Sequence, residues 1–213
     1  AVAAAHAVEA LGLERVLVTD WDVHHGNGTQ HAFERRRDVL FFSTHQYPFY
    51  PGTGAFGETG EGEGEGYTVN VPLPAGMGDA DYAAVYEGIL VPVAEAFRPQ
   101  LVLVSAGFDP HRDDPLGGMQ VTEEGFAHLC GVVKGIADRH ARGRLALILE
   151  GGYDLRGLAD SALACARVLA GGAAPEARTA PSPEARRAIA RAWDVQARYW
   201  KRPNPAFSPG LVA

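Results

Sequence analysis

Five short apolar segments, separated by longer stretches of mixed composition, constrain the fold of this 213-residue chain more than any other feature. Each is a continuous apolar run rather than an alternating one, so we expect both faces of each strand to be buried. Helical segments are expected between them, and this order predicts an α/β protein whose parallel sheet is covered by helices on both faces. The predicted strands are the run that begins at Val16 and residues 38–44, 67–71, 101–106 and 145–149.

Helices are expected between these strands and at both ends of the chain. Residues 1–13 are rich in Ala, Val and Leu, and Gly12 closes them. Asp79 is expected to cap a long amphipathic helix that Pro92 kinks or interrupts. Thr122, which two glutamates follow, is expected to start the next helix. Further helices are predicted at residues 29–34, at residues 158–169 and from Ser182, Pro183 and Glu184 onward, after a linker at residues 171–181.

Composition and charge limit the class of protein. Hydrophobic residues make up 46% of the chain and charged residues 21%, which is ordinary for a globular protein. The net charge of -7 argues against non-specific binding to nucleic acid or to an anionic membrane. No apolar run is long enough to span a bilayer. Cys130 and Cys165 suggest neither a thiolate metal site nor a disulfide framework, so a cytoplasmic location is expected. A homo-oligomer is possible.

The strand that begins at Val16 runs directly into a cluster of polar side chains. Residues two apart in an extended backbone share a face, so Asp20, Asp22 and His24 are expected to point the same way. One interpretation is that both aspartates cap a turn or a helix and that His24 is an ordinary loop histidine. Carboxylates packed together at a strand end repel one another, however, unless a cation neutralises them. A metal site is therefore the favoured interpretation.

Two other predicted strands also end in polar groups. Asp109 follows the fourth strand, and Tyr153 follows the fifth. Because ligands gather at the carboxyl ends of parallel strands, these residues should lie at one edge of the sheet. Asp22, His24 and Asp109 would give zinc three ligands and leave a fourth position open, as in catalytic sites. Tyr153 would then donate its hydroxyl to a developing oxyanion, and the alternative is an ordinary loop tyrosine.

The segment between the second and third predicted strands has an unusual composition. Residues 47–51 combine aromatic rings with prolines, which suggests either the wall of a substrate site or a loop packed on the core. Residues 52–57 formally match a dinucleotide-binding fingerprint. We reject that interpretation, because prolines precede the match and a glycine-rich acidic loop follows it, where the fingerprint requires a strand and a helix.

Three motifs in a fixed order carry a family resemblance. Residues 20–28 read DWDVHHGNG, residues 107–109 read GFD, and residues 150–154 read EGGYD. Together they resemble the histone deacetylase and acetylpolyamine amidohydrolase family over residues 1–170, and residues 114–122 resemble its class II branch and the bacterial relatives. The resemblance implies an arginase/deacetylase-like three-layer fold. It also implies zinc-dependent hydrolysis of an acetylated amine, which would be acetyl-lysine in a protein such as a histone or an acetylated polyamine.

The resemblance further implies roles for individual residues. Zinc would be bound by Asp22, His24 and Asp109, and Tyr153 would be the catalytic tyrosine. The residues implied to bind the acylated amine are Tyr50, Leu116 and Gly151. A structural potassium ion would be held by Asp20, Ser43 and Thr44, together with the carbonyls of Asp20, Asp22 and His24. A second potassium ion would be held by the carbonyls of Phe33, Arg36, Val39 and Tyr67.

Members of this family also carry a tandem histidine pair that acts as the general base, and the sequence contains no equivalent motif. His24 and His25 are not that pair, since His24 is needed as a zinc ligand. We therefore expect residues 1–170 to be the C-terminal part of a deacetylase domain, followed by the linker and by a helix and tail at residues 182–213. The base is then expected upstream of Ala1, and the chain alone is expected to be inactive.

Two alternative functions stay open at this point. A two-metal ureohydrolase of the related arginase architecture would need another aspartate two residues beyond Asp109, where this chain has His111, so a single zinc ion is favoured. A catalytically inactive, metal-stabilised module that binds acylated amines is the second alternative, because the histidine pair is missing. Iron is also able to occupy the ligands assigned to zinc.

Overall fold

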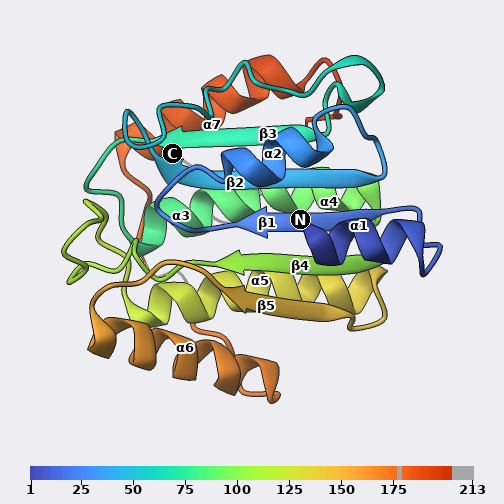
Figure 1. The fold of residues 1–213 in the computed structure, drawn as a ribbon. Helices are drawn as coiled ribbons and strands as arrows, with labels where there is room; N and C mark the ends of the chain where they lie inside the picture. The colour runs from blue at the N-terminus through green and yellow to red at the C-terminus, as the bar shows by residue number, and fades with distance from the viewer. Residues whose placement is uncertain (177–178, 203–213) are drawn as a thin grey trace.

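The computed structural model describes residues 1–176 and 179–202. Its centre is one parallel sheet whose strands lie in the order β3-β2-β1-β4-β5 (Figure 1). The chain starts in the middle strand, adds two strands on one side and then two on the other. All five predicted strands are present. They are β1 (Val16–Asp20), β2 (Val39–Gln46), β3 (Thr68–Leu73), β4 (Leu101–Ala106) and β5 (Leu145–Leu149).

Helices cover both faces of this sheet, which confirms the predicted α/β architecture (Figure 1). One face carries α1 (Val2–Glu9) and α2 (Asn27–Phe33). The other carries α3 (Asp79–Val85), α4 (Val91–Phe97) and α5 (Glu123–His140). The remaining helices are α6 (Leu155–Leu169), which packs against α5, and α7 (Pro183–Gln196), which packs against β3 and α3.

The residues of β1 alternate between two hydrophobic cores. Val16 and Val18 belong to the smaller core, which also contains Ala4 and Ala7 of α1. Leu17 belongs to the larger core, on the face covered by α3, α4 and α5. A strand buried on both faces needs an apolar side chain at every position, which is why β1 is a continuous apolar run.

The helix expected from Asp79 onward is interrupted near Pro92, as predicted. One π-helical turn (Tyr86–Leu90) separates α3 from α4. Pro92 has no N–H to donate to the carbonyl of Gly88, four residues earlier. The indole Nε1 of Trp193 in α7 donates to that carbonyl instead, at 2.9 Å. The interruption thus becomes an attachment point for the C-terminal helix.

The role predicted for Asp79 as a helix cap is wrong. The N-cap of α3 is Gly78, and Asp79 is the first helical residue. Its carboxylate accepts hydrogen bonds from the backbone N–H and from the hydroxyl of Thr122, both at 2.7 Å. Thr122 is the N-cap of α5, as predicted, and its hydroxyl oxygen accepts from the backbone N–H of Gly125. The carboxylate of Asp79 thus accepts from Thr122 at the start of α5 rather than from the N–H groups of its own helix.

Strand β5 departs from the expectation that every strand is buried on both faces. It lies at the edge of the sheet, and the side chains of Ile148 and Leu149 are 43% and 59% exposed. Helix α6 packs mainly against α5 rather than over these side chains. The apolar run therefore predicted the strand correctly but not its burial, because a run of residues carries no information about which segments lie beside it.

The C-terminal region begins its helix where the sequence predicts. Ser182 is the N-cap of α7, and its hydroxyl oxygen accepts from the backbone N–H of Ala185 at 3.1 Å. Residues 203–213 of the predicted tail lie outside the described residues. Cys130 and Cys165 are buried free thiols. In the described part of the chain, no helix has the length and apolar character needed to cross a membrane.

Candidate metal centre

Three of the predicted ligands meet at the carboxyl edge of the sheet. Asp22 and His24 lie in the bend after β1, and Asp109 follows β4, the neighbouring strand. These strands are in register, with Asp20 opposite Ser105, so the two segments leave the sheet side by side. His24 Nδ1 lies 3.0 Å from Asp22 Oδ1 and 3.1 Å from Asp109 Oδ2. One ligand atom of each residue lies within 4.8 Å of the other two, a spacing that suits a shared ion.

Main-chain N–H groups fix the orientation of both carboxylates. Asp22 Oδ1 accepts from the N–H of His24 at 2.8 Å, and Asp22 Oδ2 accepts from the N–H of Gly151 at 2.9 Å. Asp109 Oδ1 accepts from the N–H of Val23 at 2.8 Å. Asp109 Oδ2 is buried and makes no hydrogen bond with the described residues, although His24 Nδ1 is close to it. A buried carboxylate oxygen of this kind is costly unless a cation contacts it.

Burial and charge repulsion act together on Asp109. Its pKa is raised well above the ordinary range of a carboxyl group, first by burial and then by the negative charge of Asp22. A divalent cation between the two carboxylates would offset both effects, because it would neutralise the pair. Two carboxylate oxygens and one imidazole nitrogen are also the ligand types of an open zinc site. The residues present therefore fit a zinc ion.

Two glycines allow the strand ends to approach this closely. A Cβ atom on Gly151 would lie 2.2 Å from Asp109 Oδ2 and 2.7 Å from Asp22 Oδ2. A Cβ atom on Gly107 would lie 2.3 Å from Asp22 Oδ2. Both positions therefore require glycine. Gly151 was also predicted to bind substrate. In the structure its N–H donates to Asp22, and its contact with substrate stays a prediction.

Asp20 does not join the cluster, contrary to the expectation that it shares a face with Asp22 and His24. Strand β1 ends at Asp20 and the chain then bends, so the alternation of an extended strand stops there. Asp20 Oδ1 accepts from the N–H of Asp22 at 3.0 Å, and its other oxygen lies against Gly26. Burial raises the pKa of Asp20 well above its ordinary range, and the charge of Asp22 adds to this effect.

The residues predicted for the first potassium site lie together on β1 and β2. Ser43 is opposite Asp20 in the strand pairing, and the hydroxyl of Thr44 donates to the carbonyl of Asp20 at 3.4 Å. The hydroxyl of Ser43 lies 3.0 Å from His45 Nδ1. All of these side chains are buried. Buried oxygen atoms around a carboxylate are surroundings that a hard cation prefers, so the set is compatible with a cation, and the potassium site stays a prediction.

The carbonyls predicted for the second potassium site come from segments near the amino ends of β2 and β3. The carbonyl of Phe33 accepts from the N–H of Arg36 at 2.8 Å, and that of Tyr67 accepts from the N–H of Phe41 at 2.9 Å. A carbonyl oxygen has two lone pairs, so each of these keeps one for another partner. This second site stays a prediction.

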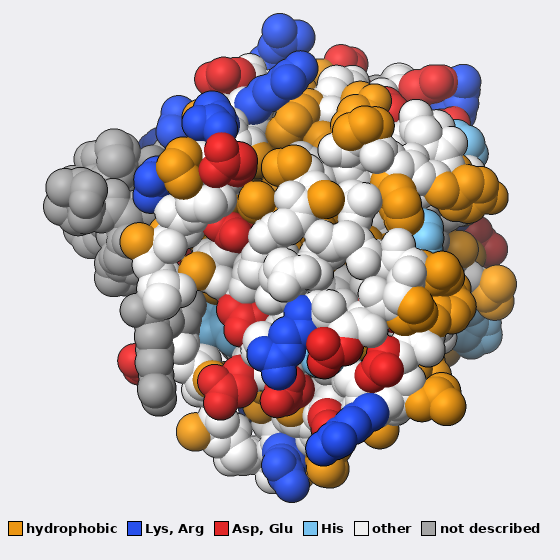
Figure 2. All heavy atoms as spheres, turned by 90° about the vertical axis from the view of Figure 1, so that its left-hand side faces the viewer, with side chains coloured by type: hydrophobic (Ala, Val, Ile, Leu, Met, Phe, Trp, Pro, Cys, Tyr) orange, Lys and Arg blue, Asp and Glu red, His pale blue; other side chains and the backbone are white. Residues whose placement is uncertain are grey.

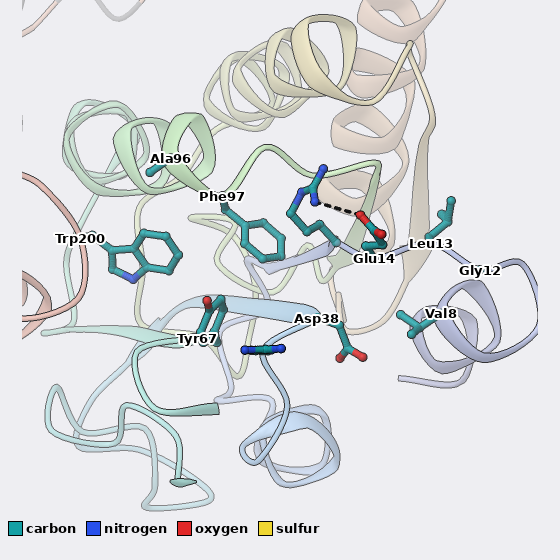
Figure 3. Close-up of a pocket in the computed structure, with 11 residues that line it drawn as sticks. Val8, Gly12, Leu13, Glu14, Asp38, Tyr67, Ala96, Phe97 and Trp200 are labelled. Atoms are coloured by element: carbon teal, nitrogen blue, oxygen red, sulfur yellow. Dashed lines mark hydrogen bonds and ion pairs between the residues drawn. The ribbon is translucent and has the colours of Figure 1, made fainter. Parts of the chain in front are cut away.

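A cavity of about 690 Å³ lies at this amino edge, away from the metal ligands (Figure 3). Tyr67, Phe97 and Trp200 form an aromatic wall on one side, and the centroids of the Tyr67 and Trp200 rings are 5.5 Å apart. Of the charged side chains around the cavity, Arg15 pairs with Glu14 at 3.3 Å. Tyr67 is the one residue with a predicted role that lines this cavity.

Comparison with known proteins identifies the family. The sequence model described as Histone deacetylase domain matches residues 1–169, which is well over half of the chain. The chain belongs to the histone deacetylase family. This membership confirms the resemblance carried by the three motifs at residues 20–28, 107–109 and 150–154.

Individual relatives agree with this assignment. Histone deacetylase 14, chloroplastic, of Arabidopsis thaliana is 46% identical over 171 residues, which are 80% of this chain and 40% of that protein. Polyamine deacetylase HDAC10 of Homo sapiens is 46% identical over 209 residues, which are 94% of this chain and 31% of that protein. The chain thus spans less than half the length of these two relatives.

Solved structures of the histone deacetylase family confirm the fold. The HDA15 HD domain superposes with a TM-score of 0.84 at 42% identity, covering 92% of this chain and 54% of that one. The histone deacetylase Clr3 gives a TM-score of 0.90 at 40% identity, covering 96% of this chain and 35% of that one. The predicted arginase/deacetylase-like fold is therefore correct.

In this histone deacetylase homologue, two residues predicted to bind the acylated amine and the predicted catalytic tyrosine are exposed at the same edge of the sheet. Tyr50, Leu116 and Tyr153 are 77%, 53% and 53% exposed. Figure 2 looks at this edge, where hydrophobic side chains lie beside a group of acidic and basic ones. Partial desolvation and then the nearby carboxylates Asp109 and Asp22 raise the pKa of the Tyr153 phenol, which is in its protonated, donating form at neutral pH.

Sequence reasoning missed Phe49 as an individual site residue. Its ring stacks on the imidazole of His24, with centroids 5.3 Å apart, whereas the Tyr50 ring meets that imidazole edge-on at 6.2 Å. Residues 47–51 were predicted as either a substrate wall or a loop packed on the core. In the structure Phe49 packs on the core and Tyr50 stays exposed, so the role of this segment as a substrate wall stays a prediction.

His111 and Asp114 are two further buried residues near the centre. His111 Nδ1 accepts from the N–H of Asp113 at 3.2 Å, and its Nε2 lies 3.7 Å from Glu123. Both ring nitrogens of His111 therefore face groups outside the cluster. Asp114 was predicted only as part of the motif at residues 114–122. An aspartate before a proline does not indicate a particular hydrogen-bond partner, so the sequence did not predict the main-chain N–H groups from which Asp114 accepts.

Proposed function

We propose that this chain carries the zinc site of a deacetylase that hydrolyses the amide bond of an acetylated amine. The observation that carries the proposal is the convergence of Asp22, His24 and Asp109, with a buried oxygen of Asp109 that lacks a hydrogen bond. The polyamine and histone deacetylases among the relatives support the same reaction class. Because the chain spans less than half of those relatives, the activity is proposed for the natural polypeptide that carries this sequence.

Each side chain at the site has a separate part in the proposed reaction. When bound, zinc would acidify a water molecule and polarise the acyl carbonyl. Asp22 and Asp109 would hold the ion, and because N–H groups already fix both carboxylates, we expect little reorganisation when it binds. Tyr153 would donate its hydroxyl to the carbonyl oxygen as negative charge develops there. Phe49 and Tyr50 would contact the aliphatic chain of the substrate.

A single metal ion suits the described residues better than a pair. A two-metal ureohydrolase would need another carboxylate two residues beyond Asp109, and that place holds His111, whose nitrogens face Asp113 and Glu123. Across residues 1–176 and 179–202, Asp22, His24 and Asp109 form the one group of three such donors close enough to share an ion. His24 is also the one histidine in that group. Because the tandem histidine pair of the family has no equivalent motif in this sequence, we expect little hydrolysis from these 213 residues alone.

The remaining parts of the proposal concern ions, substrate and location. Asp20, Ser43 and Thr44 would hold a structural potassium ion, which would neutralise the buried Asp20 carboxylate. The substrate would be acetyl-lysine of a protein or an acetylated polyamine, with no direct contact to nucleic acid. The buried free thiols of Cys130 and Cys165 are consistent with a reducing, cytoplasmic location.

Metal analysis tests the proposal directly. The natural polypeptide should contain close to one zinc ion per chain, and Asp109→Asn should lower this content strongly because it removes one ligand charge. Asp113→Asn is a matched control, since Asp113 is an exposed carboxylate four residues away that makes only long contacts, at 3.8 Å. Undiminished zinc in Asp109→Asn would contradict the ligand assignment. Cleavage of an acetyl-lysine peptide and of an acetylated polyamine would then separate the two substrate classes, and zinc binding without cleavage of either would favour the inactive binding module.

A further inference from the structure

Asp114 joins the two loops that carry Leu116 and Tyr153. Its side chain is 7% exposed, and both of its carboxylate oxygens accept from main-chain N–H groups. Oδ1 accepts from Leu116 at 2.9 Å and from Gly117 at 3.1 Å. Oδ2 accepts from Tyr153 at 2.7 Å and, over a longer distance of 3.4 Å, from Asp154. One buried carboxylate thus holds two loops that are far apart in the sequence.

The loop that contains Asp114 is itself fixed to the metal-ligand segment. The N–H of Asp114 donates to the carbonyl of His111 at 2.9 Å. Gly117 lies so close to Asp109 that a Cβ atom on it would be 2.0 Å from the Asp109 carbonyl oxygen. Gly118 donates through its N–H to the side chain of Gln46 at 2.8 Å. Asp114 therefore connects Tyr153 to a segment whose position relative to Asp109 is already determined.

Tyr153 needs such an anchor because its own surroundings hold it weakly. Its side chain is half exposed, so packing does not fix the ring. Gly151 and Gly152 precede it, and Gly152 has a φ of +132°, a conformation that favours glycine. Among the described residues, the backbone N–H of Tyr153 donates to Asp114 alone. Hydrogen bonds to charged acceptors are stronger than hydrogen bonds to neutral ones, which suits a carboxylate to this task.

We infer that Asp114 is a positioning residue for the proposed deacetylase reaction, acting through Tyr153. It sets where the Tyr153 hydroxyl and the Leu116 wall lie relative to Asp22, His24 and Asp109. The inference rests on the proposed function for its catalytic consequence, while the loop contacts stand independently of it. Misplacing a reacting group by about 1 Å typically costs on the order of 10²-fold in rate.

The test compares Asp114→Asn with Tyr153→Phe and with the double variant, in the natural polypeptide. The asparagine keeps the shape of the side chain but replaces one accepting oxygen by a donor, so it loses the N–H groups on one side. We expect Asp114→Asn to lower kcat by on the order of 10²-fold, with zinc content unchanged. In the Tyr153→Phe background the same change should lower kcat by less than about 3-fold, because residues that act through one group are not additive. Equal losses in both backgrounds would overturn the inference.

Hydrogen exchange of backbone amides gives a second readout that does not depend on activity. Asp114→Asn should speed exchange at Tyr153 or at Leu116 and Gly117, while amides in β4 stay as protected as in the unchanged protein. Asp113→Asn is the matched control for loss of one negative charge, and it should change neither kcat nor exchange at these amides. If the unchanged protein hydrolyses no acetylated amine, the proposed function fails, and the exchange data still decide whether Asp114 holds the loops. Unchanged exchange in Asp114→Asn would overturn the positioning role.

Discussion

Replacing Gly151 by alanine should weaken zinc binding much more than it weakens the fold. The new Cβ atom would lie 2.2 Å from Asp109 Oδ2 and 2.7 Å from Asp22 Oδ2, whereas ordinary contact begins at 3.4 Å. The Asp109 oxygen would have to move by the difference between 3.4 and 2.2 Å, about 1.2 Å. Ligand distances in metal sites tolerate only about 0.2 Å. We therefore expect zinc affinity to fall by about 100-fold, at the upper end of the effect of losing a residue that orients ligands.

The assay is competition for zinc against a chelator of known affinity, with urea unfolding of the metal-free protein measured beside it. Gly28→Ala is the matched control, because nothing lies within 4 Å of a Cβ atom at that position. Alanine is also the better helix former by up to about 1 kcal/mol, so Gly28→Ala in α2 should keep or raise stability and leave zinc affinity unchanged. Zinc affinity in Gly151→Ala within about 3-fold of the unchanged protein would refute the close approach on which the reasoning depends.

Three further predictions concern other parts of the molecule. Tyr153→Phe should retain zinc and bind a metal-chelating hydroxamate with modest loss, yet lower kcat by about 10²–10³-fold, and near-normal kcat would end the oxyanion role. Trp193→Phe should lower the free energy of unfolding by about 1–3 kcal/mol, because the Gly88 carbonyl loses its donor, and a loss within measurement error would show that solvent replaces it. The hydrogen bond to Glu87 is the main cause of the raised pKa of His128. The charged His128 therefore stabilises the fold below the unfolded-state pKa of about 6.5, and this stabilisation is lost as pH rises through the folded-state pKa. His128→Gln should therefore destabilise the protein more at about pH 5.5 than at about pH 9, by less than about 1 kcal/mol since Glu87 is 49% exposed, and equal losses at both pH values in urea unfolding would contradict this.

The sequence predicted the strands well because their signal is local. A continuous apolar run becomes a strand buried on both faces where helices cover both faces, as in β1, and an edge position does not decide this, since the edge strand β3 is also buried. The same rule overestimated the burial of β5, whose side chains Ile148 and Leu149 are exposed at the sheet edge. Whether a helix covers a strand depends on segments that are distant in the sequence. A single apolar run cannot encode it.

Side-chain direction at the candidate metal centre was harder to predict than which segments meet there. Alternation along an extended chain placed Asp20, Asp22 and His24 on one face, but the chain bends after Asp20 and only the latter two join Asp109. The parallel sheet explains why Asp109 was still expected beside them, and the structure places it there. The ends of neighbouring parallel strands meet whatever the loops do, whereas the direction of a residue beyond a strand end depends on the local bend.

The glycine-rich acidic loop shows what composition alone hides. This loop belongs to residues 52–66, and Glu58 anchors it from within. Its Oε1 accepts from the N–H groups of Gly54 and Ala55, both at 2.9 Å, and its Oε2 accepts from the side chain of Gln30 at 2.7 Å. His25 Nε2 lies 2.9 Å from the amide oxygen of the same glutamine. Such a network is assembled from isolated polar residues on separate elements, so no window of sequence contains its pattern.

The candidate metal centre likewise depends on separate segments, because main-chain N–H groups rather than side chains orient its predicted ligands. Val23 and Gly151 each use an N–H to hold one carboxylate oxygen of a ligand that stands on a different strand end. The identity of Val23 is thus irrelevant to its hydrogen bond, and the identity of Gly151 matters only because a Cβ atom would collide with the ligands. Asp114 shows the opposite arrangement, because its side chain accepts a hydrogen bond from the main-chain N–H of Tyr153. Motifs in a sequence reveal the donors of such a site, while its geometry is a property of the sheet edge that brings three chain segments together.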